Sequence, residues 1–451
     1  MEHDTVLRSG PAIDAAGIFL VLITVCVFVL PILIYFPPTT PSKTEALLQT
    51  HAKFGLDPSK SKLDSRSSPA PTGSRQGTLR SLWIYPIKSC KGIELTQSKV
   101  LPTGLEFDRL FTFAQQKSPF PVSLDASDEE KTRHQWEFVT QRQYPLLATI
   151  QVDLYLPDIV KSKGHSIKSS DAFIVVRFPW QETGPWGKLE WIAAKIVRGR
   201  SAQPEKEIIL PVTFPPQAEI SERGYTFEDV TIWKETVTAL NLEKELPAEL
   251  RLYLGVSNRL GLFHVDPARL REVHRCAPTA AQAGYQPITG FQDAYPLHLL
   301  NLSSVRDLDA KIDKDNILKS LDPRRFRANL IAVDGVDDYD EETWKTIRFK
   351  PGSSNVRRQT STFHVSCRTV RCKLPNVDPD SGIRHPAEPD RSLRKFRDVD
   401  EGAKNKGCLG MQLTPLFDNA ADSSPEDLES WVEVGMSIDV VDRGSHTYIT
   451  Q

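Results

Sequence analysis

Cysteine is scarce in this sequence, with six residues spread over 451 positions. So small and scattered a set cannot form the disulfide framework of a small secreted protein. It suits a reducing compartment, where cysteine serves packing, metal binding or catalysis. A large excess of one charge is also missing, because 56 basic and 58 acidic side chains leave a formal net charge of −2. We therefore expect no nucleic-acid partner.

The sequence does contain one long apolar run, residues 15–36, which carries no charged side chain. About 20 apolar residues suffice to cross the hydrocarbon core of a bilayer. A cleaved signal peptide would have a basic leader and a shorter apolar core. Here acidic residues precede the run and Pro37 follows it. The sequence therefore predicts an uncleaved transmembrane helix at 15–36, after a short N-terminal tail at 1–14.

The basic residues near this run predict its orientation. Several lysines and Arg66 follow the run, whereas only Arg8 precedes it. Because positive charge is enriched on the cytosolic side, we expect a single-pass protein whose C-terminal body faces the cytosol. Residues 37–77 are rich in Pro, Ser, Thr and Lys, and we expect a flexible linker there.

From residue 78 onward the pattern is that of a β-rich body. Short apolar segments separated by turns are typical of a barrel-like β structure with few helices. Polar stretches at 115–135, 158–170 and 180–206 indicate loop insertions. Helices are predicted at 243–254 and 303–312. Strands are predicted at 79–86, 99–102, 110–114, 147–156, 173–178, 208–214, 236–240 and 431–441.

The first cluster of candidate binding residues is the turn 85–92, which contains Lys88 and Ser89 and is followed by Arg109. Cationic side chains, a hydroxyl and backbone N–H groups on turns can hold an anionic group. A solvated basic turn is the alternative, and the cluster alone does not decide between them.

The second cluster is the segment 322–330, in which Arg324, Arg325 and Arg327 surround Phe326 before an apolar strand. This arrangement could hold a phosphate. The alternative is an exposed basic loop with a packed phenylalanine.

The third cluster runs from Cys367 to Cys372, continues with the turn 377–382 and ends in the basic segment 393–397. Neighbouring arginines such as Arg371 favour the thiolate, the form that binds soft metals. A zinc site made of cysteines and one histidine is the alternative, although the spacing is not that of a Cys-x-x-Cys knuckle. Its candidate ligands are Cys367, Cys372 and Cys408 with His364 or His385.

The order of these clusters resembles the MOSC-domain family, and within it the mitochondrial amidoxime-reducing components. The resemblance extends over about residues 79–441. It implies a β-rich α+β fold, with a MOSC-type N-terminal β-barrel module at 78–255 and a MOSC β-barrel domain at 256–445, preceded by the transmembrane helix. The runs that carry it are 82–92, 140–146, 291–297 and 371–382.

The resemblance also implies the cofactor, a molybdenum-molybdopterin group, and the residues around it. Cys372 corresponds to the cysteine that ligates molybdenum, and it is the predicted catalytic and metal-binding residue. The tail at 407–412 departs from the amidoxime-reducing pattern, which leaves the substrate face less well defined than the cofactor site. The predicted cofactor-binding residues are Lys88, Ser89, Arg109, Ser303, Arg327, Asn329 and Arg371.

The implied activity is reduction of small N-hydroxylated substrates. The sequence shows no nicotinamide, flavin or haem fingerprint, so electrons would come from a partner protein. The resemblance implies that this partner is a b-type cytochrome with its NADH-dependent reductase. The run 15–36 would anchor the protein in the lipid bilayer, which the resemblance implies is the outer mitochondrial membrane, with the endoplasmic reticulum as the alternative. Two other functions stay open: a sulfur carrier or transferase like the C-terminal domain of molybdenum-cofactor sulfurase, and a non-catalytic cofactor-binding protein.

Overall fold

The structure is a computed structural model. The chain divides into two units, one made of residues 1–42 and 179–206 and the other of residues 43–178 and 207–451. The structure describes residues 14–35, 43–63, 77–119, 121–161, 171–199, 202–333, 337–418, 424 and 427–449.

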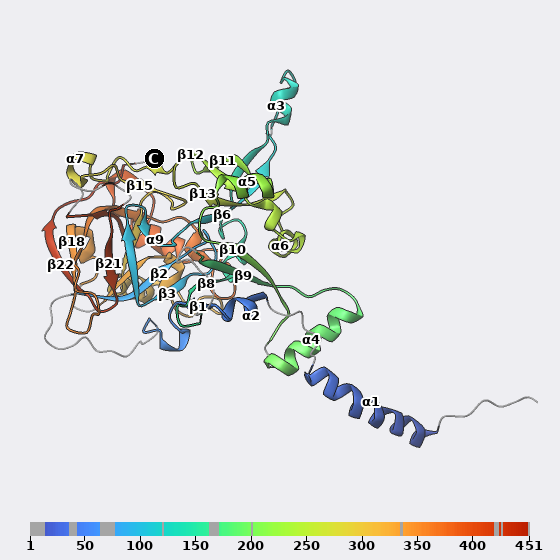
Figure 1. Cartoon of the computed structure of the whole chain (residues 1–451). Coiled ribbons are helices and arrows are strands. Elements are labelled where there is room, and N and C mark those ends of the chain that lie inside the picture. The colour runs from blue at the N-terminus through green and yellow to red at the C-terminus, as the bar shows by residue number, and fades with distance from the viewer. Residues whose placement is uncertain are drawn as a thin grey trace, which may run out of the picture. The chain divides into compact units, whose positions relative to one another are not determined.

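The described residues of the first unit form two helices, α1 (Ala15–Tyr35) and α4 (Pro185–Arg198) (Figure 1). Helix α1 occupies the run in which the sequence predicts a transmembrane helix. However, none of the helices in the described ranges is both long and apolar enough to cross a membrane. The predicted transmembrane helix thus has no support from the structure.

Helix α4 lies in the stretch 180–206, where the sequence predicts only a loop insertion. Pro185 stands in the first turn, where its missing N–H costs no hydrogen bond. Apolar side chains recur at helical spacing at Leu189, Ile192 and Ile196. The local pattern therefore favours a helix, and the prediction of a loop was wrong here.

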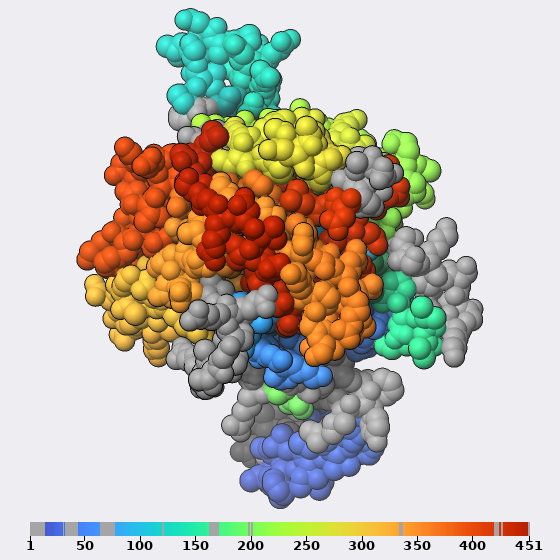
Figure 2. All heavy atoms as spheres, turned by 90° about the vertical axis from the view of Figure 1, so that its left-hand side faces the viewer, coloured from blue at the N-terminus to red at the C-terminus, as the bar shows by residue number. Residues whose placement is uncertain are grey.

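A closed five-stranded barrel forms one half of the second unit, in the order β11-β12-β13-β6-β7. Most of it falls within the predicted module 78–255, and its last strand lies beyond residue 255. The segment between β6 and β7, which carries α3 (Asp128–Thr132), projects from the body in both views (Figures 1 and 2). The strands are β6 (Phe111–Lys117), β7 (Gln135–Phe138), β11 (Thr226–Ile232), β12 (Glu235–Asn241) and β13 (Leu260–Val265).

An eight-stranded sheet forms the other half, in the order β17-β16-β20-β19-β18-β22-β2-β3. Strand β17, the first in this order, also pairs with β2, the seventh, and Leu330 lies opposite Leu82. The strands are β2 (Thr78–Ile84), β3 (Ile93–Leu95), β16 (Leu297–Asn301), β17 (Leu330–Val333), β18 (Trp344–Lys350), β19 (Ser361–Val370), β20 (Cys408–Leu416) and β22 (Ser437–Arg443).

Part of the predicted linker 37–77 has regular structure. Residues 43–63 contain α2 (Lys43–Leu48) and β1 (His51–Phe54), and β1 pairs with β8 so that His51 lies opposite Pro157. The smaller sheets are ordered β1-β8-β9-β10, β21-β4-β5 and β14-β15. Their other strands are β4 (Gln97–Leu101), β5 (Gly104–Leu105), β8 (Gln151–Pro157), β9 (Phe173–Pro179), β10 (Glu205–Pro211), β14 (Arg271–Glu272), β15 (Ile288–Thr289) and β21 (Ser430–Glu433).

The helices of the second unit are short. The predicted helix 243–254 forms a 3₁₀ turn and then α6 (Ala248–Leu254), because Pro247 separates the two. The predicted helix 303–312 is confirmed as α8 (Leu302–Lys311). The others are α5 (Gln217–Arg223), α7 (Ala280–Ala283) and α9 (Asp390–Phe396).

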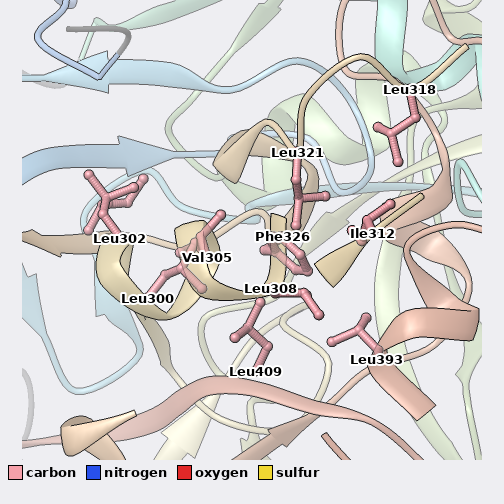
Figure 3. Close-up of a cluster of buried hydrophobic side chains, with 12 residues drawn as sticks. Leu300, Leu302, Val305, Leu308, Ile312, Leu318, Leu321, Phe326, Leu393 and Leu409 are labelled. Atoms are coloured by element: carbon pink, nitrogen blue, oxygen red, sulfur yellow. The ribbon is translucent and has the colours of Figure 1, made fainter. Parts of the chain in front are cut away.

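Helix α8 supplies much of a buried apolar cluster beside the eight-stranded sheet. Its side chains Val305 and Leu308 pack in this cluster with Phe326, Leu393 and Leu409, which come from distant parts of the chain (Figure 3). The packing fixes the segment around Phe326 and the segment around Leu393 relative to the sheet. Both segments also contribute to the functional site.

A substitution that opens a cavity tests this packing. Leu308 is 0% exposed, and Leu308→Ala should lower the free energy of unfolding by about 2–5 kcal/mol, because it removes buried methyl groups and leaves a void. Arg306→Ala, on the exposed side of the same helix, should change it by about 0.5 kcal/mol or less. Urea unfolding of the two variants measures the difference, and equal effects would contradict the described packing.

Candidate functional site

One cavity of about 600 Å³ gathers most of the residues that the sequence predicts for the cofactor. They come from four places: the turn after β2, the segment before β6, the segment before β17, and the segment after β19. Pairing of β2 with β17 and of β16 with β17 brings these distant segments together. The predicted residues that line the cavity are Lys88, Ser89, Arg109, Arg327, Asn329, Arg371 and Cys372.

Ser303 is the exception, because it does not line this cavity. It lies in the first turn of α8, where its backbone N–H donates to the side chain of Asn301. The neighbouring Ser304 donates its hydroxyl to Glu341 at 2.8 Å. Both serines belong to the start of a helix packed on the sheet, so the predicted role of Ser303 in cofactor binding has no geometric basis.

The cavity lining is strongly basic. Asp293 is the one carboxylate among the described lining residues. Carboxylates behind the lining pair with two of these cations, because Arg109 forms an ion pair with Asp108 and Arg368 forms ion pairs with Glu342 and Asp400. Such a wall attracts an anionic ligand, and burial strengthens the attraction because the local dielectric constant is low. The basic residues are Lys88, Arg109, Arg142, Lys234, Arg327, Arg368, Arg371, Arg394 and Lys406.

Lys88 lies almost completely buried at one side of the cavity. Its ammonium group donates to the carbonyl of Phe291 at 2.6 Å and forms an ion pair with Asp293 at 2.7 Å. Burial lowers the pKa of Lys88 and would raise that of Asp293, but the adjacent ammonium holds the pKa of Asp293 below its usual value. Asp293 is therefore ionised near neutral pH and supplies the countercharge for the ammonium group of Lys88.

Two arginines flank the buried ring of Tyr85. The guanidinium of Arg327 lies 4.1 Å from the ring centroid and that of Arg109 lies 4.6 Å from it. Arg327 donates to the carbonyl of Cys90 at 2.7 Å, and Arg109 donates to the carbonyl of Arg327 at 3.1 Å. Stacking and hydrogen bonds thus fix the directions of both cations before any ligand binds.

The backbone at this site is strained. Ser89, Arg109 and Arg327 have φ angles of 67°, 52° and 54°, in the left-handed region that residues with a side chain rarely adopt. Strain of this kind is kept where surrounding structure enforces it, and it concentrates at functional sites. Here it occurs at three of the residues that the sequence predicts to contact the cofactor.

Arg371 and Cys372 follow the end of β19. The backbone N–H of Arg371 donates to the carbonyl of Gly407, and its side chain donates to the carbonyl of Phe326 at 3.0 Å. These bonds fix the direction in which the chain leaves the strand. Cys372 is partly exposed and lines the cavity, whereas Cys367 and Cys408 are buried and do not.

Several polar atoms in the cavity wall are buried without a hydrogen-bond partner. They are Nε2 of His298, Nη2 of Arg327, Oγ1 of Thr369 and Nε of Arg371. A buried polar atom without a partner costs about 1–3 kcal/mol, so such atoms rarely collect in one place unless a ligand satisfies them. Their collection beside a free thiol and many cations fits an anionic cofactor that also takes a sulfur ligand.

Asn329 lines the cavity but also serves the fold. Its side-chain NH₂ donates to the carbonyl of Trp83 at 3.1 Å, and its side-chain oxygen accepts from the backbone N–H of His298 at 3.2 Å. It therefore ties β2 to β16 at the cavity wall. In the described structure its amide positions the strands that carry the other lining residues.

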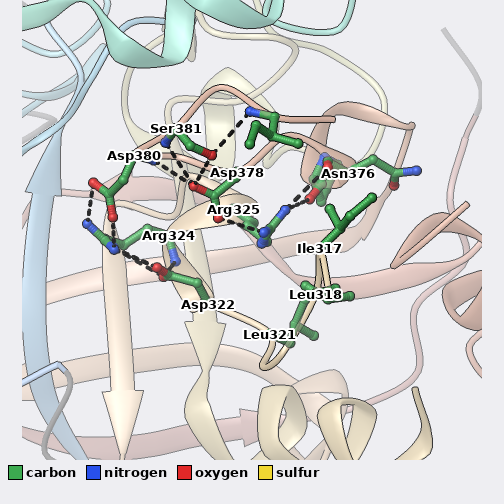
Figure 4. A network of polar contacts seen from close by, with 12 residues as sticks. Ile317, Leu318, Leu321, Asp322, Arg324, Arg325, Asn376, Asp378, Asp380 and Ser381 are labelled. Atoms are coloured by element: carbon green, nitrogen blue, oxygen red, sulfur yellow. Dashed lines mark hydrogen bonds and ion pairs between the residues drawn. The ribbon is translucent and has the colours of Figure 1, made fainter. Parts of the chain in front are cut away.

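A network of ion pairs holds the turn after Cys372 (Figure 4). Arg324 forms an ion pair with Asp380 at 2.6 Å, and the buried Arg325 forms one with Asp378 at 2.8 Å. Arg325 also donates to the carbonyls of Pro375 and Asn376. Arg324 and Arg325 of the second cluster thus fix the loop that follows Cys372, and Arg327 is the one of its three arginines that lines the cavity.

The zinc alternative has no geometric support. Among the described residues, no group of three or more His, Cys, Asp or Glu side chains is placed to hold a metal ion. Cys372 is therefore the one cysteine among the described residues that line the cavity, and it does not belong to a group of zinc ligands.

Sequence reasoning missed part of the lining. Thr140 and Arg142 belong to a run that carries the family resemblance, and so do Asp293 and Tyr295, but none was assigned a role. Arg394 lies in the basic segment noted beside the third cluster. No sequence signal pointed to Trp233, Lys234, His298, Lys406, Gln412 and Tyr448, which also line the cavity.

Comparison with known families decides the classification. Residues 76–184 match the MOSC N-terminal beta barrel domain, and residues 287–438 match the MOSC domain. The chain is a MOSC-domain protein.

This MOSC protein also resembles whole proteins over most of its length. It is 22% identical over 342 residues to mitochondrial amidoxime reducing component 2 of Rattus norvegicus, covering 76% of this chain and 77% of the relative. It is 24% identical over 332 residues to mitochondrial amidoxime-reducing component 1 of Mus musculus, covering 71% and 72%. Molybdenum cofactor sulfurase of Arabidopsis thaliana is 24% identical over 374 residues, which cover 75% of this chain and 42% of the relative.

Acid should weaken the turn that follows Cys372 in the MOSC domain. Burial would raise the pKa of Asp378, but hydrogen bonds from Ser381 and the nearby Arg325 hold that pKa below its ordinary 3.8. A carboxyl with a lowered pKa stabilises the fold above its ordinary pKa, and the contribution is lost as pH falls through the lowered value.

We therefore expect Asp378→Asn to lower the melting temperature at neutral pH, by a difference that shrinks as the pH falls below 3.8. Melting curves from about pH 2 to 7 measure the difference, with the exposed Asp313→Asn as control. A difference that does not shrink in acid would contradict the ion-pair network.

Proposed function

We propose that this protein is a molybdenum-cofactor enzyme that reduces small N-hydroxylated substrates. The observation that carries the proposal is the cavity itself, in which unpartnered polar atoms and a strongly basic wall surround the partly exposed thiol of Cys372. The similarity to amidoxime-reducing components over about three quarters of both chains supports the same activity.

The cavity residues divide the work of holding such a cofactor. Lys88, Ser89, Arg109 and Arg327 face the anionic part, because directed cations and N–H groups suit phosphate oxygens. Cys372 supplies the thiolate ligand, which suits a soft metal. When bound, the cofactor would supply the two-electron redox chemistry that the side chains lack.

Other lining residues act on the reaction indirectly. Arg371 directs Cys372 through its own hydrogen bonds to Gly407 and Phe326. The pKa of His298 lies well below its usual value because burial and the cations Arg371 and Arg109 disfavour its charged form. His298 is therefore a neutral hydrogen-bonding group at the cavity wall and adds no further positive charge.

Electrons for the reaction would come from a partner protein. The sequence carries no nicotinamide, flavin or haem fingerprint, so we propose a b-type cytochrome with its NADH-dependent reductase as the source. The names of the relatives favour a mitochondrial location. The membrane span predicted for residues 15–36 has no support among the described helices and is not part of the proposal.

Sulfur transfer to the cofactor is the second candidate function. The match to molybdenum cofactor sulfurase covers 42% of that protein, and this chain shows no pyridoxal-phosphate domain that could generate a persulfide. Reduction of an amidoxime by the purified protein with an artificial electron donor, in the absence of any sulfur donor, distinguishes the two functions.

Replacement of the Cys372 thiol tests the role of the metal ligand independently of the residues that bind the pterin. The full chain made in a molybdopterin-producing host should contain molybdenum and pterin. Cys372→Ser should retain the pterin, because the basic wall is unchanged, but should lose amidoxime turnover by about 100-fold or more. Cys26→Ser, at an exposed cysteine of α1, serves as the control and should keep full turnover.

Metal analysis, pterin fluorescence and turnover of these proteins make the measurement. Absence of molybdenum and pterin from the unsubstituted chain would contradict the proposed function. Unchanged turnover in Cys372→Ser would contradict the role assigned to the thiol.

The position of the cations can be tested in the same way. Arg327→Met removes a buried donor aimed at the ligand, and a charge-assisted hydrogen bond of this kind contributes about 1.5–3 kcal/mol, so pterin retention should fall roughly 10- to 100-fold. Arg394→Met removes an exposed cation at the rim and should reduce retention by about fivefold or less. Pterin content after gel filtration measures the retention of cofactor by both variants. Equal losses would contradict the proposal that Arg327 binds the anionic part of the cofactor.

A further inference from the structure

Two cysteines outside the proposed catalytic role lie together behind the cavity wall. Cys276 stands on the turn between β14 and α7, and Cys367 stands in β19. Although far apart in sequence, they pack in one small cluster that also contains Val273 and Tyr295. Both thiols are free in the structure.

The surroundings of the two sulfurs differ. Cys367 is 0% exposed, whereas Cys276 is only half-buried on its turn. In its protonated form the thiol of Cys276 donates to the carbonyl of Thr447 at 3.6 Å, and Cys367 and Tyr295 pack in the same cluster. Cys276 is therefore the more accessible residue of the pair, and the buried Cys367 packs in the same cluster.

Hydrogen bonding gives the exposed sulfur thiolate character. The hydrogen bond from Cys367 lowers the pKa of Cys276 to about 6, against the opposing effects of burial and of the Asp400 carboxylate. The same hydrogen bond and burial raise the pKa of Cys367 well above its usual value. Near neutral pH the pair therefore contains one reactive thiolate and one protected thiol.

We propose that Cys276 and Cys367 form an oxidant-sensitive dithiol, which a hydroperoxide converts to a disulfide. The pair does not line the cavity, and its chemistry is separate from that assigned to Cys372. It lies instead against Tyr295 and Tyr448, which pack in the same cluster and do line the cavity.

The reaction balances in two steps. The Cys276 thiolate attacks the outer oxygen of the hydroperoxide, the O–O bond breaks, and an alcohol (or water) leaves while Cys276 becomes a sulfenic acid. The Cys367 sulfur then attacks the Cys276 sulfur, the S–S bond forms, and the hydroxyl of the sulfenic acid leaves as water with the Cys367 proton. Two thiols supply two electrons, and the peroxide accepts them.

The position of the pair connects its redox state to the cavity rim. The C-terminal tail reaches this place because Arg368 donates to the carbonyl of His446 at 2.8 Å and the backbone N–H of Tyr448 donates to Asp400 at 2.8 Å. Closing the disulfide would fix the turn that carries Cys276 to the strand that leads to Cys372, beside two tyrosines of the wall.

Peptide mapping of the full chain tests the proposal. The protein is treated with hydrogen peroxide, remaining thiols are alkylated, and the digest is examined by mass spectrometry. We expect a peptide pair linked through Cys276 and Cys367 that dithiothreitol separates. Its rate of formation should rise with pH around a midpoint of about 6.

Two variants serve as controls. Cys276→Ser should abolish the linked pair and leave Cys367 alkylatable after denaturation, because the buried thiol has no partner. Cys408→Ser, at another buried cysteine outside the cluster, should leave the linked pair unchanged. Recovery of both cysteines as free thiols would overturn the proposal. So would a Cys276 sulfinic acid beside a free Cys367, or a link from either residue to Cys372.

Discussion

Many positively charged side chains surround one cavity, and their mutual repulsion is the constraint on which the rest of this structure depends. Lys88, Arg109, Arg327 and Arg371 are all drawn toward the same space, and Asp293 is the one carboxylate among the described lining residues. Part of the repulsion is relieved within the protein, by the Lys88–Asp293 and Arg109–Asp108 ion pairs and by stacking of two arginines on Tyr85. The remainder is best relieved by an anionic ligand.

The fold brings these charges together through strand pairing. Strand β2 pairs with β17 and β3, so the turn that follows β2 reaches the segment that precedes β17. Asn329 ties β2 to β16 at the same point. Farther along, Arg324 and Arg325 fix the turn after Cys372. The thiol and the cations therefore occupy fixed positions that the sheet and these ion pairs enforce.

Much of the site could be predicted from the sequence because its residues lie in short local motifs. The runs around Lys88, Arg327 and Cys372 each contain the basic or sulfur side chains that line the cavity. What failed was the placement of residues whose role depends on tertiary contacts. Ser303 lies in the first turn of α8, and Arg325 binds Asp378 in the turn after Cys372 and does not line the cavity.

The fold was predictable to a similar extent. Alternating apolar patterns located strands such as β2 and β6, and the helix α8 was expected. Strand order, the closed barrel and the pairing of β1 with β8 depend on contacts between distant segments, which no local pattern encodes. Helix α4 was missed because its polar residues suggested a loop, although its apolar side chains recur at helical spacing.

The most direct test of the proposed cofactor site is X-ray absorption spectroscopy at the molybdenum edge of the full chain loaded with cofactor. We predict that the metal in the unsubstituted protein has one more sulfur neighbour than the metal in Cys372→Ser. Identical sulfur coordination in the two proteins would show that Cys372 is not the ligand and would contradict the site described above.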